Sequence, residues 1–177
     1  YSAEGAVYET VKSTLEVTIP VVDWNAKYTN LGSPAASMLY SFPDNGGNTI
    51  STGTYYNFSD GMLLPNYFVV KHNAEGNVVW NNVYNEANNN LAGGIIARAD
   101  KDGNILVCLL PEFDGPLKIK KLSPAGTQLW EEDIALNSPQ VYVMEMGTDG
   151  SIYMGGVAFE EETDEHPAFV GLKLNGA

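Results

Sequence analysis

The sequence predicts an all-β fold built from about three copies of a four-stranded unit. Three observations support this fold class: a residue pattern recurs at an interval of 50, short β-type runs alternate with Gly-containing turns, and almost no segment has helical apolar spacing. The chain has 177 residues and is 44% hydrophobic, which suits one domain with a sizeable core. We therefore expect residues 1–177 to form a single repeat-built domain.

The clearest repeat relates residues 67–80 to residues 117–130. Both segments contain a lysine, a glycine and a tryptophan at the same spacing: Lys71, Gly76 and Trp80 in the first, and Lys121, Gly126 and Trp130 in the second. A further copy begins at residues 169–176, and Trp24 opens an echo of residues 80–84. The pattern indicates a hairpin whose second strand carries the tryptophan.

A second pattern lies between the tryptophans. It is marked by an Asp-Gly pair, at Asp102 and Gly103 and again at Asp149 and Gly150, with a looser copy at Asp44. An Asp-Gly pair between β-type runs is a strong hairpin signal, and we expect type I′ turns, in which both central residues have positive φ. Each unit thus consists of two hairpins.

Four short strands in a unit of about 40 to 50 residues match the blade of a β-propeller. The expected units cover approximately residues 15–65, 66–115 and 116–167, with a partial strand at 168–177. The recurring tryptophan would be a structural residue that fills the wedge between neighbouring blades, because a large flat side chain buries roughly 150–250 Å².

Together, the two patterns resemble the degenerate propeller repeats of secreted and surface proteins of Bacteroidetes and similar bacteria. The matching residues are Phe68, Lys71, Gly76, Trp80, Asp102, Gly103, Asn104 and Ile105 in one copy, and Lys121, Gly126, Trp130, Asp149, Gly150, Ile152 and Tyr153 in the next. The resemblance covers about residues 20–177. It implies a blade fold and a surface location, and it carries no catalytic motif.

The two ends of the chain supply complementary parts of a unit. Residues 15–24 read as a Trp-ending strand without the strand that should precede it, and residues 169–174 read as a strand of that missing type. Closed propellers have roughly four to eight blades, so about three blades leave alternatives open. The chain is a fragment of a longer propeller, two copies close one ring, copies join head to tail through exposed strand edges, or the fold is a β-sandwich.

The charge balance excludes a nucleic-acid partner. The chain has 22 acidic and 9 basic residues, a net charge of −13, whereas nucleic-acid binding needs cations that displace counterions from phosphate. An apolar run of about 18 residues is lacking, so we expect no membrane span. The start at Tyr1 and a composition rich in Asn, Gly, Tyr and Thr indicate an extracellular or cell-surface protein whose targeting segment has been removed, or part of a longer chain.

The densest acidic run, residues 160–166, contains the candidate metal ligands Glu161, Asp164 and His166. The Asp-Gly turns are further candidates for calcium, because carboxylates and turn carbonyls are its usual ligands. A solvated loop and ordinary turn chemistry are the alternative interpretations of these two features. We predict no other cofactor.

A cluster of aromatic residues is the best indication of a binding surface. Tyr55, Tyr56, Phe58 and Tyr67 surround the long connection of the first unit, and such rings stack on sugars or anchor protein interfaces. Core packing is the alternative. Cys108 lies in the middle of an apolar strand, and we expect a buried, unreactive thiol.

The sequence contains no motif for a nucleophile, a phosphate-binding loop or a general base, so we predict no catalytic residue and no enzyme. We expect an extracellular structural or adhesive module that self-associates, as a dimer or head-to-tail polymer, or that binds a surface partner. The alternatives are a carbohydrate- or peptide-binding surface protein and a glycosidase-type enzyme with paired carboxylates.

Overall fold

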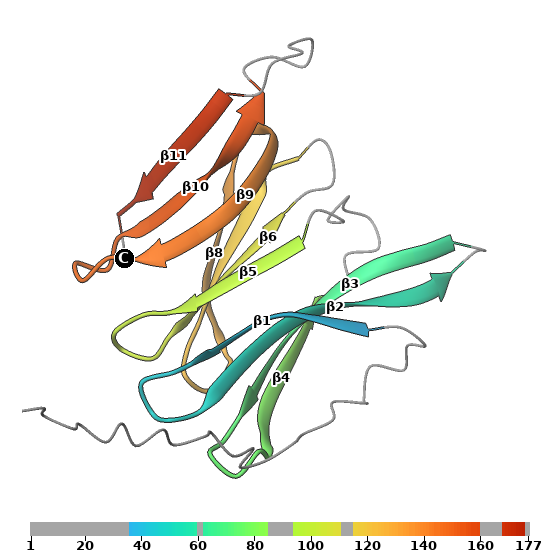
Figure 1. Cartoon of the computed structure of the whole chain (residues 1–177), viewed down its shortest axis with the longest axis vertical. Helices are drawn as coiled ribbons and strands as arrows, with labels where there is room; N and C mark the ends of the chain where they lie inside the picture. The colour runs from blue at the N-terminus through green and yellow to red at the C-terminus, as the bar shows by residue number, and fades with distance from the viewer. Residues whose placement is uncertain (1–35, 60–61, 85–93, 111–114, 160–167, 176–177) are drawn as a thin grey trace, which may run out of the picture.

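The computed structural model describes residues 36–59, 62–84, 94–110, 115–159 and 168–175. This part of the chain is all-β and forms three antiparallel sheets, two of four strands and one of three, which confirms the prediction of an all-β fold (Figure 1). Among the described residues there is no helix of the length and hydropathy that crossing a membrane requires.

The strands follow one another within each sheet in chain order. Sheet A contains β1 (Ala36–Pro43), β2 (Thr49–Ser59), β3 (Met62–His72) and β4 (Val78–Tyr84). Sheet B contains β5 (Gly94–Ala99), β6 (Ile105–Leu110), β7 (Leu117–Leu122) and β8 (Gln128–Ile134). Sheet C contains β9 (Asn137–Met146), β10 (Ile152–Phe159) and β11 (Ala168–Leu174).

The two hairpins of the repeat follow one another in the same order in sheets A and B. In sheets A and B the hairpin with the aspartate-containing turn comes first, and the hairpin that ends in tryptophan follows it. The expected unit 66–115 therefore includes the second half of sheet A and the first half of sheet B. No sheet closes on itself within the described ranges.

Sheet B lies between the other two sheets, as the burial of β6 on both faces shows. All six of its residues are buried, although a strand directs successive side chains to opposite faces. Ile105, Val107 and Leu109 belong to the core shared with sheet A, whereas Leu106 and Cys108 belong to the core shared with sheet C. A continuous apolar run is therefore stable here because both faces of the strand are covered.

The cores on either side of sheet B contain side chains from its two neighbours. Sheet A contributes Ile50, Tyr67 and Val69 to the first core. Sheet C contributes Val141, Met144, Ile152 and Met154 to the second. Trp80 packs against the first core and Trp130 against the second, which confirms that the recurring tryptophan lies between neighbouring sheets. Trp24 lies outside the described residues.

The turns within the hairpins correct one prediction. At Asp100, the amide donates to the carbonyl of Asn104 at 2.8 Å, and the carbonyl of Asp100 accepts from the amide of Gly103 at 3.1 Å. This is a type I turn followed by a glycine in the left-handed region, and it gives a three-residue loop with a bulge. The predicted two-residue type I′ turn is wrong, because the loop has one residue more and the positive φ falls on the glycine that follows the turn.

The same hydrogen-bond pattern recurs in all five turns within the described hairpins. Their glycines have φ between 77° and 83°, and they are Gly47, Gly76, Gly103, Gly126 and Gly150. Only glycine adopts this region without strain, which explains why it recurs in both hairpins of the repeat.

Candidate interaction surface

Each sheet contains an ion pair between a lysine of its third strand and an aspartate of its first turn. The pairs are Lys71–Asp44 at 2.7 Å, Lys121–Asp100 at 3.2 Å and Lys173–Asp149 at 3.5 Å. The recurring lysine of the sequence therefore joins the two hairpins of one sheet.

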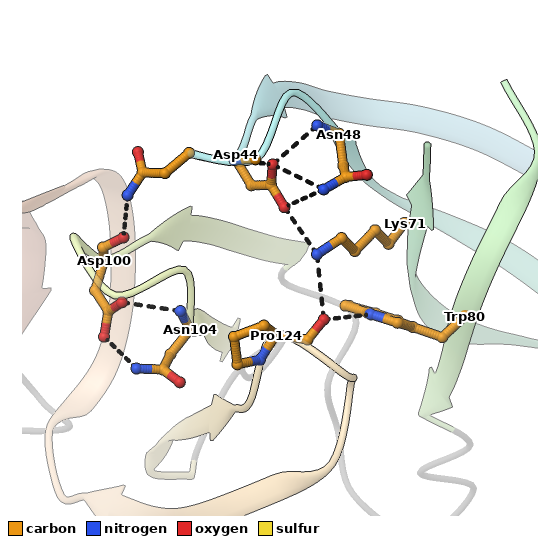
Figure 2. Close-up of polar contacts among 9 residues, drawn as sticks. Asp44, Asn48, Lys71, Trp80, Asp100, Asn104 and Pro124 are labelled. Atoms are coloured by element: carbon orange, nitrogen blue, oxygen red, sulfur yellow. Dashed lines mark hydrogen bonds and ion pairs between the residues drawn. The ribbon is translucent and has the colours of Figure 1, made fainter. Parts of the chain in front are cut away.

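The pair in sheet A, drawn in Figure 2, is the most buried of the three. The side chains of Lys71 and Asp44 are 8% and 4% exposed. The Asp44 carboxylate also accepts hydrogen bonds from the amides of Gly46 and Asn48, at 2.8 and 2.9 Å. Burial acts to raise the pKa of Asp44, but Lys71 and these hydrogen bonds outweigh it and lower the pKa to about 2.

The lysine and the tryptophan of sheet A converge on one turn of sheet B. Lys71 Nζ donates to the Pro124 carbonyl at 3.2 Å, and Trp80 Nε1 donates to the same oxygen at 2.9 Å (Figure 2). Asn82 Nδ2 donates to the Gly126 carbonyl at 2.7 Å. The turn between β7 and β8 is thus one point at which sheet B attaches to sheet A.

Gly126 is required at this attachment for two reasons. Its φ is +83°, which disfavours any residue with a Cβ atom. A Cβ atom here would also lie 2.8 Å from the Trp80 ring. The glycine of the second hairpin therefore serves both the turn and the contact between sheets.

A second contact between sheets joins the first turns. Asn45 Nδ2 donates to the carbonyls of Asp100 and Lys101, at 3.2 and 2.9 Å. The Asp100 carboxylate in turn accepts from the amides of Asp102 and Asn104, both at 2.9 Å. Sequence reasoning selected Asp102, because it precedes the glycine, and missed Asp100. The signal that could have found Asp100 is that it occupies the first position of the turn, as Asp44 does.

Sheet C carries a weaker version of the ion pair. Its turn begins with Gly147, so the carboxylate lies two positions later, at Asp149. The side chains of Lys173 and Asp149 are about half exposed. Lys173 also lies over the Tyr153 ring, 5.3 Å from its centre. This pair is therefore open to solvent where its counterpart in sheet A is buried.

The face of sheet C that points away from sheet B exposes apolar residues. Val143 and Tyr153 are 55% and 43% exposed. Gly155 lies opposite both Val143 and Gly171 in the strand register. A Cβ atom at Gly171 would meet nothing within 4 Å. We call the surface formed by Val143, Tyr153, Gly155, Gly171 and Lys173 the open face.

The four aromatic residues predicted to bind a ligand do not form one surface. Tyr55 and Tyr67 are 2% and 1% exposed and belong to separate clusters on opposite faces of sheet A. The Tyr67 hydroxyl accepts a hydrogen bond from the Gly94 amide at 3.2 Å. Tyr56 lies at the surface, and the side chain of Phe58 lies outside the described residues. A role for these rings in binding stays a prediction.

The predicted metal ligands Glu161, Asp164 and His166 also lie outside the described residues. Within the part of the chain that the structure describes, no group of three His, Cys, Asp or Glu side chains could hold a metal ion. The carboxylates of Asp44 and Asp100 are engaged by lysines and turn amides.

Cys108 is fully buried, and burial raises the pKa of its thiol to about 12. The prediction that this thiol is buried in the middle of a strand is confirmed, and its lack of reactivity stays a prediction that burial and the raised pKa support. A comparison with models of known protein families finds no match, and a search of curated proteins finds no relative. The function must therefore be argued from the surfaces of the chain itself.

Proposed function

We propose that this chain is a non-enzymatic, extracellular interaction module of the β-propeller type that assembles with further copies of itself through sheet C. The open face of sheet C is the observation that carries this proposal. The corresponding faces of sheets A and B are each covered by the next sheet, whereas Val143 and Tyr153 are exposed. Large apolar residues gathered on one sheet face are typical of an interface.

The arrangement of the sheets supports the propeller-type fold. Sheets A and B share the same order of hairpins and the same register between the third and fourth strands. Trp80 and Trp130 occupy equivalent places in the two cores. Repetition of one contact between successive sheets is the principle by which propellers and other repeat proteins extend.

The environments of the perturbed acidic groups support a structural role rather than catalysis. Lys120 donates a 2.6 Å hydrogen bond to Glu131 and lowers the pKa of that carboxylate. The pKa values of Asp44 and Asp100 are also lowered, because the hydrogen bonds and the lysine at each turn outweigh the effect of burial. Both turns hold the fold together. In an active site, a carboxylate instead faces a cleft that a substrate can enter.

The second candidate function is recognition of a carbohydrate or peptide at the surface of sheet C. Tyr142 is 61% exposed and Tyr153 is 43% exposed, and such rings can stack on a sugar. A module of this kind would remain monomeric without ligand, and its tryptophan or tyrosine fluorescence would change on addition of glycans.

The test is the absolute mass of the purified chain, measured by light scattering over a range of micromolar concentrations, with and without a chelator. We expect a mass above that of one chain, which Val143→Glu reduces to the monomer because it places a charge in the interface. Leu129→Glu is the matched control, since Leu129 is also an apolar strand residue, is 54% exposed, and belongs to sheet B, which lies between the other two sheets. A monomeric wild-type chain at every concentration would refute the proposal.

A further inference from the structure

One row of residues across sheet C presents three different chemical groups on the open face. Tyr153 on β10 lies opposite Glu145 on β9 and opposite Lys173 on β11. Residues opposite one another in a sheet direct their side chains to the same face. The side chains of Glu145 and Lys173 are 71% and 49% exposed. From β9 to β11, the row therefore presents a carboxylate, an aromatic ring and an ammonium group.

The neighbouring row of the open face has a side chain at one end and room at the other. Val143 on β9 lies opposite Gly155, and Gly155 lies opposite Gly171 on β11. Val143 is 55% exposed, whereas a Cβ atom at Gly171 would meet nothing within 4 Å. The face therefore projects at Val143 and is flat over the two glycines.

We propose that the open faces of two copies pack against each other about a two-fold axis parallel to β10. This inference rests on the proposed function, because it names the surface of the second copy that the open face contacts. Such a rotation keeps each row at its own level and exchanges β9 with β11. Glu145 of each copy then lies opposite Lys173 of the other, and Val143 lies opposite Gly171 of the other. Tyr153 lies on the axis and meets the Tyr153 ring of the second copy.

Both rows become complementary in this arrangement. Each Val143 side chain occupies space that Gly171 of the other copy leaves, as side chains of two facing sheets interdigitate. The two Tyr153 rings form an aromatic pair, which stabilises contacts beyond the area that it buries. The ion pairs between Glu145 and Lys173 lie on both sides of these rings, where charges determine the orientation of the partners.

Charge favours this axis over one that runs across the strands. An axis across the strands keeps β9 against β9 and β11 against β11, so the Glu145 carboxylates gather on one side and the Lys173 ammonium groups on the other. Like charges that meet in an interface oppose association. Each copy also carries a net charge of −13, so two copies repel each other unless the surface at which they meet pairs its own charges.

The outer face of sheet A is a poorer partner for the open face. Sheets A and C lie at the two ends of the row of sheets (Figure 1). On the face of sheet A that points away from sheet B, Tyr55, Phe68 and Val70 are 2%, 4% and 0% exposed. These side chains are already buried within one chain and offer little apolar surface to a second. The open face of another copy exposes such surface, and a two-fold contact between identical faces closes as a dimer.

Exchanging the charges at the two ends of the first row tests the axis. We would measure the dissociation constant of the dimer by light scattering over a concentration series for full-length Glu145→Lys, Lys173→Glu and the double variant. Each single variant places like charges opposite each other in both pairs of the dimer, so we expect the dissociation constant to rise at least about tenfold. An equimolar mixture of the two single variants pairs opposite charges again, and so does the double variant. We expect both to return to within about threefold of the wild-type value.

The matched controls make the same changes of charge outside the open face. Glu75→Lys changes an exposed residue of the turn between β3 and β4, and Lys101→Glu changes a residue of the turn between β5 and β6 whose side chain is 65% exposed. We expect their dissociation constants to stay within about twofold of the wild-type value. Circular dichroism and the urea midpoint show whether each variant keeps the fold.

Gly171→Leu tests the shape of the interface without a change of charge. The φ of Gly171 is not positive and its Cβ position is open, so leucine fits the single chain. In the dimer, the leucine occupies the space that Val143 of the other copy needs, and we expect at least about tenfold weaker association. If the open face were only a sticky apolar surface, leucine would instead strengthen association, and that result would overturn the proposed packing.

The remaining outcomes separate this arrangement from the proposed function. Dimers that form equally well in the single charge variants and in the controls, or a mixture that stays as weak as its components, would overturn the two-fold arrangement while the proposed function stands. Wild-type assemblies that grow beyond the dimer would do the same. A wild-type chain that is monomeric at every concentration would refute both proposals.

Discussion

Lys71 and Asp44 form a 2.7 Å ion pair in which both side chains are less than a tenth exposed. The pair joins the third strand of sheet A to its first turn, and Lys71 also donates to the Pro124 carbonyl in sheet B. One ammonium group therefore connects the two hairpins of one sheet and attaches that sheet to its neighbour.

Replacing Lys71 should destabilise the fold strongly. Lys71→Met leaves the buried Asp44 carboxylate without its partner, and we expect a loss of about 3–5 kcal/mol in the free energy of unfolding, measured by urea denaturation. Lys101→Met is the control, because Lys101 forms an ion pair of similar length, 2.8 Å, with Asp102 but both side chains are exposed. We expect little change there. Similar losses in both variants would contradict this account.

The stability of the protein should fall in acid as Asp44 becomes protonated. Its pKa is lowered from 3.8 in the unfolded chain to about 2 in the fold. A lowered carboxylate pKa stabilises the fold above the unfolded pKa, and this contribution is lost as the pH falls from about 4 to 2. We expect it to amount to about 2 kcal/mol. We would measure the urea midpoints of the wild-type chain and of Asp44→Asn between pH 5 and pH 2, at intervals of about half a pH unit. The midpoint should fall less steeply with decreasing pH in Asp44→Asn. An unchanged slope would argue against a contribution from this pair.

The two roles of Gly126 can be separated by comparison with Gly103. Both have φ near +80°, so an alanine at either site should cost about 1–2 kcal/mol in backbone strain. A Cβ atom at Gly126 would also lie 2.8 Å from Trp80, whereas at Gly103 the nearest atom is 3.6 Å away. Gly126→Ala should therefore be more destabilising than Gly103→Ala by about 1–3 kcal/mol in thermal or urea unfolding. Equal effects would mean that the turn alone requires the glycine.

Cys108 should react with a thiol reagent only when the protein unfolds. The side chain is fully buried and burial raises its pKa to about 12, so both access and ionisation oppose the reaction. Labelling by a chromogenic disulfide should be slow in buffer and should follow the urea unfolding curve. Lys101→Cys provides the exposed reference in the same chain, because the Lys101 side chain is 65% exposed and lies outside the open face. Rapid labelling of wild-type protein in buffer would show that sheet B opens locally.

Several elements of the fold were predictable because their signals are local. The continuous apolar run at residues 105–110 is long enough for one strand, and it became β6. The recurring glycines marked the hairpin turns, although the turn type was wrong. The turn type depends on loop length, and one additional residue before Asp102 changes which atoms pair across the loop.

The aromatic cluster shows why the candidate surface was less predictable. Tyr55 and Tyr67 are close in the sequence, in a segment rich in aromatic residues. Because side chains alternate along each strand, the two rings lie on opposite faces of sheet A. Val143 carries no distinguishing sequence signal, and the sequence marked Tyr153 only as a residue of the repeat. They are exposed because no described sheet covers that face of sheet C.

The sequence by itself determined the β class, the repeat of glycine, lysine and tryptophan, and the position of the hairpins, because each follows from backbone conformation and side-chain periodicity over a few residues. Only the tertiary structure decided that Lys71 pairs with Asp44, that Trp80 contacts the turn containing Gly126, and that sheet C has an open face. These relationships join residues far apart in the chain, and their energies depend on burial, which exists only after the sheets have packed against one another.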